Sequence, residues 1–139
     1  MSVVTKGIEL QTRGETDVID ITRDVQDAVS RSELSSGTAT VFVSGSTAGV
    51  TTIEYESGAV RDFQGAIDRI APKDIHYYHD ARWGDGNGYS HVRAATLGPS
   101  LTVPFSSKKL LLGTWQQIVL VDFDNRPRSR KIVVQLMGE

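Results

Sequence analysis

The chain of 139 residues is long enough for one hydrophobic core, so we expect a single domain over residues 1–139. Its net charge of −2 gives no general attraction to nucleic acid, and no stretch approaches the roughly 20 apolar residues of a membrane span, so we expect a cytoplasmic protein with neither as a partner. The lack of cysteine excludes disulfides, thiolate nucleophiles and sulfur-bound zinc, and leaves His, Asp and Glu as the strong metal ligands.

Two segments of alternating character open the chain and predict strands. Val3–Thr12 and Asp17–Ile21 alternate apolar and polar residues, as a half-buried strand does, and we expect them to be joined around Gly14. Thr22 is expected to cap the helix that follows, because apolar residues recur at helical spacing from Val25 onwards.

The middle of the chain predicts two further strands and a second helix. β-Branched and aromatic residues favour strands at Thr38–Ser44 and Val50–Glu56. Between Ala59 and Ala71 the apolar residues follow one helical stripe, and Pro72 prevents the helix from continuing.

From Lys73 to Ser90 the periodicity disappears, and we interpret this segment as the most function-like loop of the chain. His91–Leu97 then predicts a short helix or turn. Four strands are expected to follow, at Leu101–Phe105, Lys109–Leu112, Trp115–Phe123 and Arg130–Met137, with the last two joined as a hairpin through Asp124–Pro127. These elements predict an α+β fold.

Two histidines and two aspartates form the clearest polar cluster. His79 and His91 are twelve residues apart, with Asp80 and Asp85 between them. If the glycine-rich loop folds back, two imidazoles and a carboxylate can reach one ion. The alternative is that each histidine only satisfies a hydrogen bond, and His76, outside the cluster, is given that plainer interpretation.

A second candidate is the small-residue loop Gly45–Gly49. Its backbone N–H groups and the hydroxyls of Ser46 and Thr47 could converge on an anion, although a plain glycine turn explains the loop equally well. Glu54 and Glu56 alternate along the next predicted strand, which places both carboxylates on one face, either in a site or in solvent.

Basic residues gather around the last predicted turn, namely Arg126, Arg128, Arg130 and Lys131. Strand alternation sends Arg128 and Arg130 to the same side, where they could meet a phosphate-bearing ligand. The alternative is that they are solubilising surface charge.

Three motifs resemble one known family. Gly45–Glu54 (GSTAGVTTIE), Tyr78–Gly98 (YHDARWGDGNGYSHVRAATLG) and Gly113–Gln117 (GTWQQ) resemble the YjbQ-like family of small uncharacterised proteins, which are also called secondary thiamine-phosphate synthases. The motifs occur in the family's order along almost the whole chain.

The resemblance implies an α+β fold in which a curved, mostly antiparallel sheet or sandwich is covered by two main helices. It also implies a homotrimer with pockets near the subunit interfaces, and a protein that binds a divalent metal ion such as zinc, magnesium or calcium. The implied activity is a weak replacement of thiamine-phosphate synthase, a transferase that joins a pyrimidine diphosphate to a thiazole phosphate. The implied partner is therefore a small phosphorylated molecule.

Matching the family pattern position by position gives candidate site residues. The implied catalytic residues are His79, His91, Asp85 and Glu54, and the implied metal ligands are His79, His91 and Asp85. The implied ligand-binding residues are Asn87, Arg93, Thr114 and Gln116, to which the small-residue loop and the basic cluster add Ser46, Thr47 and Arg128.

Two positions depart from the family pattern. Many relatives have histidine where this chain has Gly45, and some have histidine at the position of Tyr89. With fewer imidazoles, the remaining ligands would hold a cation together with more water molecules. Three functions therefore remain open, which are an enzyme, a non-catalytic metal- or anion-binding protein, and a module whose histidines only hold the trimer together.

Overall fold

The computed structural model describes residues 1–139 and contains eight strands and four helices. The strands are β1 (Ser2–Gln11), β2 (Asp17–Asp20), β3 (Gly37–Val43), β4 (Ala48–Ile53), β5 (Ser100–Ser106), β6 (Lys109–Leu110), β7 (Gln117–Asp122) and β8 (Ser129–Gly138). The helices are α1 (Thr22–Arg31), α2 (Ser57–Ile70), α3 (Tyr78–Trp83) and α4 (Gly88–Leu97).

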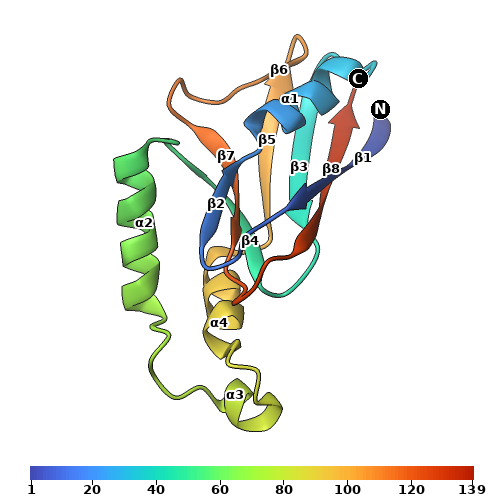
Figure 1. Cartoon of the computed structure of the whole chain (residues 1–139). Coiled ribbons are helices and arrows are strands. Elements are labelled where there is room, and N and C mark those ends of the chain that lie inside the picture. The colour runs from blue at the N-terminus through green and yellow to red at the C-terminus, as the bar shows by residue number, and fades with distance from the viewer.

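The strands form two antiparallel sheets, with α3 and α4 at one end of the molecule and both chain termini at the other (Figure 1). The larger sheet has the order β1-β8-β3-β5-β6, and the smaller sheet has the order β2-β7-β4. Every strand pair in both sheets is antiparallel. The predicted α+β fold with a curved antiparallel sandwich is therefore confirmed.

Strand β7 is the central strand of the fold, and both of its faces are buried. Ile118 and Leu120 contribute to a core shared with the larger sheet and α1, whereas Val119 and Val121 contribute to a second core with α2 and α4. A strand buried on both faces carries a continuous apolar run, and the sequence IVLV of β7 is such a run. The smaller sheet is thus a middle layer between the larger sheet and the helices α2 and α4.

Helix α1 begins at Thr22, but the prediction that Thr22 caps it is wrong. Asp20 takes that part, because its Oδ1 accepts hydrogen bonds from the Thr22 N–H at 3.0 Å and from the Thr22 hydroxyl at 2.7 Å. The Thr22 hydroxyl in turn accepts the N–H of Ile118 at 2.8 Å, which joins the helix to β7. Val25 and Val29 bury the predicted apolar face.

The predicted strand Val50–Glu56 ends earlier, at Ile53. Glu56 precedes α2, and its carboxylate accepts the N–H groups of Gly58 at 2.6 Å and Ala59 at 2.9 Å. Glu54 and Glu56 therefore do not share a strand face as predicted, because the free N–H groups at the start of α2 recruit Glu56 as a cap.

The segment Lys73–Ser90 is more ordered than its lack of periodicity predicts. It contains the six-residue helix α3, none of whose residues is buried, and α4 begins at Gly88 rather than at His91. A helix without a buried face has no apolar stripe, so periodicity cannot reveal it. None of the four helices combines the length and the apolar character needed to cross a membrane.

The predicted hairpin through Asp124–Pro127 does not exist. Strand β7 pairs with β2 and β4, whereas β8 pairs with β1 and β3, so the connection crosses from one sheet to the other. Alternation along two successive strands is the same for a hairpin and for a crossing, so the pattern alone does not distinguish them.

Candidate functional site

The two predicted histidines meet where α3 and α4 adjoin, at the lower end of Figure 1. The rings of His79 and His91 have centroids 4.4 Å apart, and their planes are inclined by 39°. Asp85, in the loop between the two helices, places Oδ1 3.4 Å from Nδ1 of His79. The three residues of the predicted metal set therefore lie together.

Asp80 belongs to the same cluster, although it was not among the predicted ligands. Its Oδ1 is also 3.4 Å from Nδ1 of His79, and one donor atom from each of His79, Asp80 and Asp85 lies within 4.8 Å of the other two. Two ligands at about 2.1 Å from a tetrahedral zinc ion are themselves about 3.4 Å apart, so each carboxylate already has ligand spacing to His79. The sequence signal for Asp80 is its place beside His79.

The cluster is accessible to solvent. The side chains of His79, Asp80 and Asp85 are 30%, 29% and 50% exposed. His91 contributes no donor atom to the closely spaced set of three, and its ring lies against that of His79 instead. The arrangement offers one nitrogen and two oxygen ligands to an ion, with a second imidazole at its side.

Two glycines shape the loop that carries Asp85. Gly84 (φ 68°) and Gly86 (φ 65°) adopt the left-handed conformation, which costs residues with a Cβ more than glycine. Between them, Oδ1 of Asp85 accepts the N–H of Asn87 at 3.2 Å. Asp80 accepts the N–H of Gly88, the first residue of α4, at 2.7 Å. The loop thereby brings Asp85 to His79, whereas Asp80 is the neighbour of His79 within α3.

Asn87, a predicted ligand-binding residue, is used inside the protein. It is buried, and its Oδ1 accepts the Ser90 hydroxyl at 2.5 Å and the N–H of Asn125 at 3.1 Å. Its Nδ2 donates to Oδ2 of Asp124 at 3.3 Å. Both polar atoms of the side chain are therefore engaged.

Asp124 is fully buried and gathers several predicted site residues. Its Oδ2 accepts the Thr47 hydroxyl at 2.8 Å and pairs with Nε of Arg128 at 3.0 Å. Burial opposes ionisation of this carboxyl, but the hydrogen bonds from Thr47 and Asn87 and the adjacent positive charge of Arg128 outweigh burial and lower the pKa of Asp124. Thr47 and Arg128 are thus bound to an internal carboxylate, and Ser46 is exposed beside Thr47.

Arg130 forms a second buried ion pair beside this one. Its Nε and Nη2 donate to the two oxygens of Asp122 at 2.7 and 2.9 Å. A Cβ at Gly45 would lie 2.8 Å from Nη1 of Arg130. The glycine at this position therefore leaves room for the guanidinium of Arg130.

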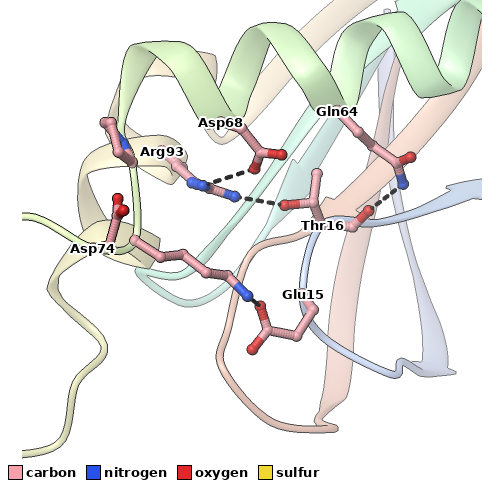
Figure 2. A pocket seen from close by; sticks show the side chains of 8 residues that line it. Glu15, Thr16, Gln64, Asp68, Asp74 and Arg93 are labelled. Carbon is pink, nitrogen blue, oxygen red and sulfur yellow. Dashed lines mark hydrogen bonds and ion pairs between the residues drawn. The ribbon is translucent and has the colours of Figure 1, made fainter.

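Arg93 lies away from the histidines, at a polar cavity of about 440 Å³ between α2, α4 and the turn before β2 (Figure 2). Its guanidinium is 1% exposed and donates to Oγ1 of Thr16 at 2.9 Å, to Oδ1 of Asp68 at 3.0 Å and to a main-chain carbonyl. An ion pair between Lys73 and Glu15 lines the same cavity. Arg93 is therefore already neutralised within the fold.

Tyr89 connects α4 to this cavity rather than to the histidines. Its hydroxyl donates to Oε2 of Glu15 at 3.0 Å, and its ring lies 4.9 Å from the guanidinium carbon of Arg93. Burial, together with the bond to Glu15, raises the pKa of Tyr89 to about 12. Tyr89 and Arg93 are one helical turn apart, whereas His91 lies on another face of α4.

Three predicted site residues lie at the far end of the smaller sheet. Strand β4 pairs with β7 over six residues, about 17 Å, with Asp122 at one end and Gln117 at the other. Glu54, Thr114 and Gln116 lie just beyond the Gln117 end. Within one chain they do not meet His79.

A sequence profile of the family "UPF0047 protein YjbQ-like" matches residues 6–139. A UPF0047 protein from Methanothermobacter thermautotrophicus is 36% identical over 139 residues, which cover 100% of this chain and 95% of that protein. The UPF0047 protein YugU of Bacillus subtilis is 32% identical over 135 residues, which cover 96% and 98% of the two chains.

Solved structures share the fold. A YbjQ-like protein of unknown function from Sulfolobus solfataricus P2 superposes with a TM-score of 0.94 at 31% identity, over 99% of each chain. An uncharacterised conserved protein of the YjbQ/UPF0047 family from Clostridium acetobutylicum gives a TM-score of 0.87 at 34% identity, over 95% of this chain and 99% of that chain. The family profile and the relatives span nearly the whole chain, and this protein therefore belongs to the YjbQ-like (UPF0047) family.

Proposed function

We propose that this protein binds a divalent metal ion through His79, Asp80 and Asp85, with His91 beside the ion, and uses the ion on a small phosphorylated molecule. The observation that supports the proposal is the approach of one imidazole, that of His79, and two carboxylates to one solvent-accessible point, with the ring of His91 against that of His79. One nitrogen and two oxygen ligands at this spacing suit zinc, whereas magnesium or calcium would retain more water ligands.

The roles of the four residues follow from their positions. His79, Asp80 and Asp85 hold the ion, and His91 is the remaining group able to move a proton, because its ring is adjacent but contributes no donor to the closely spaced set. A bound cation supplies positive charge for a phosphate or diphosphate group.

The reaction class that we propose is of the thiamine-phosphate synthase type. The bond between the pyrimidine's methylene carbon and the diphosphate breaks, the thiazole nitrogen forms the new bond to that carbon, and pyrophosphate leaves, with His91 donating a proton to the oxygen that was bonded to the carbon. The ion would stabilise the charge that develops on the leaving diphosphate, and the two rings must be held in contact for the transfer.

A specific observation favours a second candidate, a metal-binding protein without chemistry of its own. The two arginines expected to steer phosphate are both paired with carboxylates of this chain, Arg93 with Asp68 and the partly exposed Arg128 with Asp124. A catalyst for diphosphate transfer would need free cationic groups in addition to the ion, and neither arginine supplies one in this arrangement.

We also propose that the protein assembles as a homotrimer. Support comes from the separation of the predicted site residues into two groups at opposite ends of the smaller sheet, about 17 Å apart within one chain. A neighbouring copy could bring its Glu54, Thr114 and Gln116 to the His79 end. Light scattering should give three times the mass of one chain, and a monomeric mass would contradict the assembly.

Turnover measurements separate the two candidates. Protein purified without an affinity tag is saturated with zinc, and pyrophosphate release from the pyrimidine and thiazole phosphates is followed with and without a chelator. The enzyme proposal predicts metal-dependent release that His91→Ala abolishes while the ion stays bound. Bound metal without release supports the second candidate, and the absence of both contradicts the site.

A further inference from the structure

We propose that the buried Asp124 holds the Asp85 loop of the metal site in place through Asn87, so that Asn87 and Asp124 are positioning residues. This inference rests on the proposed metal site and extends it to residues that no ligand touches. It replaces the sequence-based expectation that Asn87 binds the ligand directly.

A continuous set of hydrogen bonds joins Asp124 to Asp85. Asn87 donates from its side chain to Oδ2 of Asp124 at 3.3 Å and from its main-chain N–H to Oδ1 of Asp85 at 3.2 Å. Asn125, the neighbour of Asp124, donates from its side chain to the main-chain carbonyl of Asp85 at 2.9 Å. Both the side chain and the backbone of Asp85 are thereby tied to the segment that follows β7.

The loop has little else to fix it. Residues 81–86 are all exposed, so no buried apolar contact holds this stretch. A Cβ added at Gly84 or Gly86 would meet nothing within 4 Å, and both positions carry the conformational freedom of glycine. Apart from the approach to His79, the position of the Asp85 carboxylate therefore depends on the hydrogen bonds to Asn87 and Asn125.

Asp124, in contrast, is a rigid anchor. It is fully buried, it is held by Thr47 and Arg128, and its N–H donates to Oδ1 of Asp122 at 2.9 Å. Groups that orient metal ligands in this way typically change metal affinity by about 10- to 100-fold when they are removed.

The test compares Asn87→Ala with Thr12→Val. Thr12 is a matched control, because it is buried in the same network but donates to Oδ2 of Asp122, at 2.6 Å, and makes no contact with the loop. Cobalt(II), a coloured substitute for zinc, is titrated into each variant, and amide hydrogen exchange of residues 84–88 is measured on the metal-free proteins.

Asn87→Ala should weaken cobalt binding by about 10- to 100-fold, alter the visible spectrum and accelerate exchange at residues 84–88, whereas Thr12→Val should do none of these. Asn87→Asp should open the loop as well, because it retains the shape but sets a second carboxylate against Asp124. Unchanged exchange and affinity in Asn87→Ala would overturn the inference, as would equal effects of Thr12→Val. If the wild type binds no cobalt, the metal site fails, and hydrogen exchange still decides the positioning role.

Discussion

The imidazole rings of His79 and His91 lie 4.4 Å apart, although a helix end and two glycines of left-handed conformation separate them along the chain. Their approach requires α3 to end at Trp83 and α4 to begin at Gly88. The hydrogen bond from Gly88 to Asp80 joins the two helices at this point. The contact between the two histidines therefore depends on the loop between α3 and α4. Substitutions in this loop should disturb the histidine site more than they disturb the hydrophobic core.

Removing the cap of α2 should destabilise the protein in a pH-dependent manner. The main-chain N–H groups of Gly58 and Ala59 lower the pKa of Glu56. Because the folded-state pKa is depressed, the stabilisation is present above the ordinary pKa of glutamate and is lost as the pH falls through the folded-state value. Glu56→Ala should therefore melt at a lower temperature than wild type at neutral pH, with a smaller difference in acid.

Glu54→Ala is the control for this experiment, since Glu54 is exposed and accepts no hydrogen bond at the start of α2. Melting curves by circular dichroism decide the matter. Equal melting temperatures for Glu56→Ala and Glu54→Ala at neutral pH would contradict the capping role.

Replacing Arg93 should cost far more stability than replacing an exposed arginine. Arg93→Met leaves a buried hydroxyl and a main-chain carbonyl without their donor and Asp68 without its partner, which typically costs about 2–4 kcal/mol. Arg61→Met, on the exposed side of α2, should change the free energy of unfolding by less than about 0.5 kcal/mol. Urea unfolding of both variants tests this, and similar midpoints would show that the Arg93 contacts contribute little.

Tyr89 should make the protein sensitive to alkaline conditions. Its pKa is raised to about 12 in the folded protein, against about 10 for a free tyrosine. The folded-state pKa is the higher one, so the contribution of the protonated hydroxyl is complete below about pH 10 and disappears as the pH rises toward about 12. Urea unfolding between about pH 8 and 11 should show a steeper loss of stability for wild type than for Tyr89→Phe. If the free energy of unfolding depended on pH in the same way in wild type and Tyr89→Phe, the stabilising role of the Tyr89 hydroxyl would be contradicted.

Two glycines with similar backbone angles should tolerate alanine very differently. A Cβ at Gly14 (φ 77°) would lie 2.6 Å from the carbonyl oxygens of both Arg126 and Asp124, whereas one at Gly84 (φ 68°) would meet nothing within 4 Å. Gly84→Ala should cost about 1–2 kcal/mol for the left-handed conformation alone. Gly14→Ala should cost clearly more, because the backbone itself must move. Denaturation of the metal-free variants measures the free energy of unfolding. Equal losses in the two variants would show that the backbone around Gly14 rearranges at little cost.

The elements that were predicted correctly are those in which the local pattern of apolar residues indicates which face of the element is buried. The stripe of α1 at Val25 and Val29 and the apolar run of β7 follow directly from contact with a core, so local periodicity is sufficient to find them. For His79 and His91 the sequence left two possibilities, a shared cluster if the glycine-rich loop folds back or separate hydrogen bonds, and the structure brings the two rings together.

What could not be predicted depends on partners that are distant in the sequence. Asn87 is 37 positions from Asp124 and Arg93 is 25 positions from Asp68, so no local pattern shows that these side chains are already paired. The ligand-binding role of both residues was implied only by the resemblance to the family, which gives no information about their partners within this chain. Asp124 was predicted only as a turn residue, since nothing in its neighbourhood marks a buried carboxylate.

Calorimetric titration of zinc into the tag-free protein tests the proposed centre most directly. His79→Ala removes the nitrogen to which both carboxylates are adjacent, and His76→Ala is the matched control, because His76 is exposed and its ring packs against Tyr78 instead. We predict one zinc ion per chain in wild type and in His76→Ala, and loss of that binding in His79→Ala. Absence of binding in wild type, or equal binding in His79→Ala, would contradict the metal site.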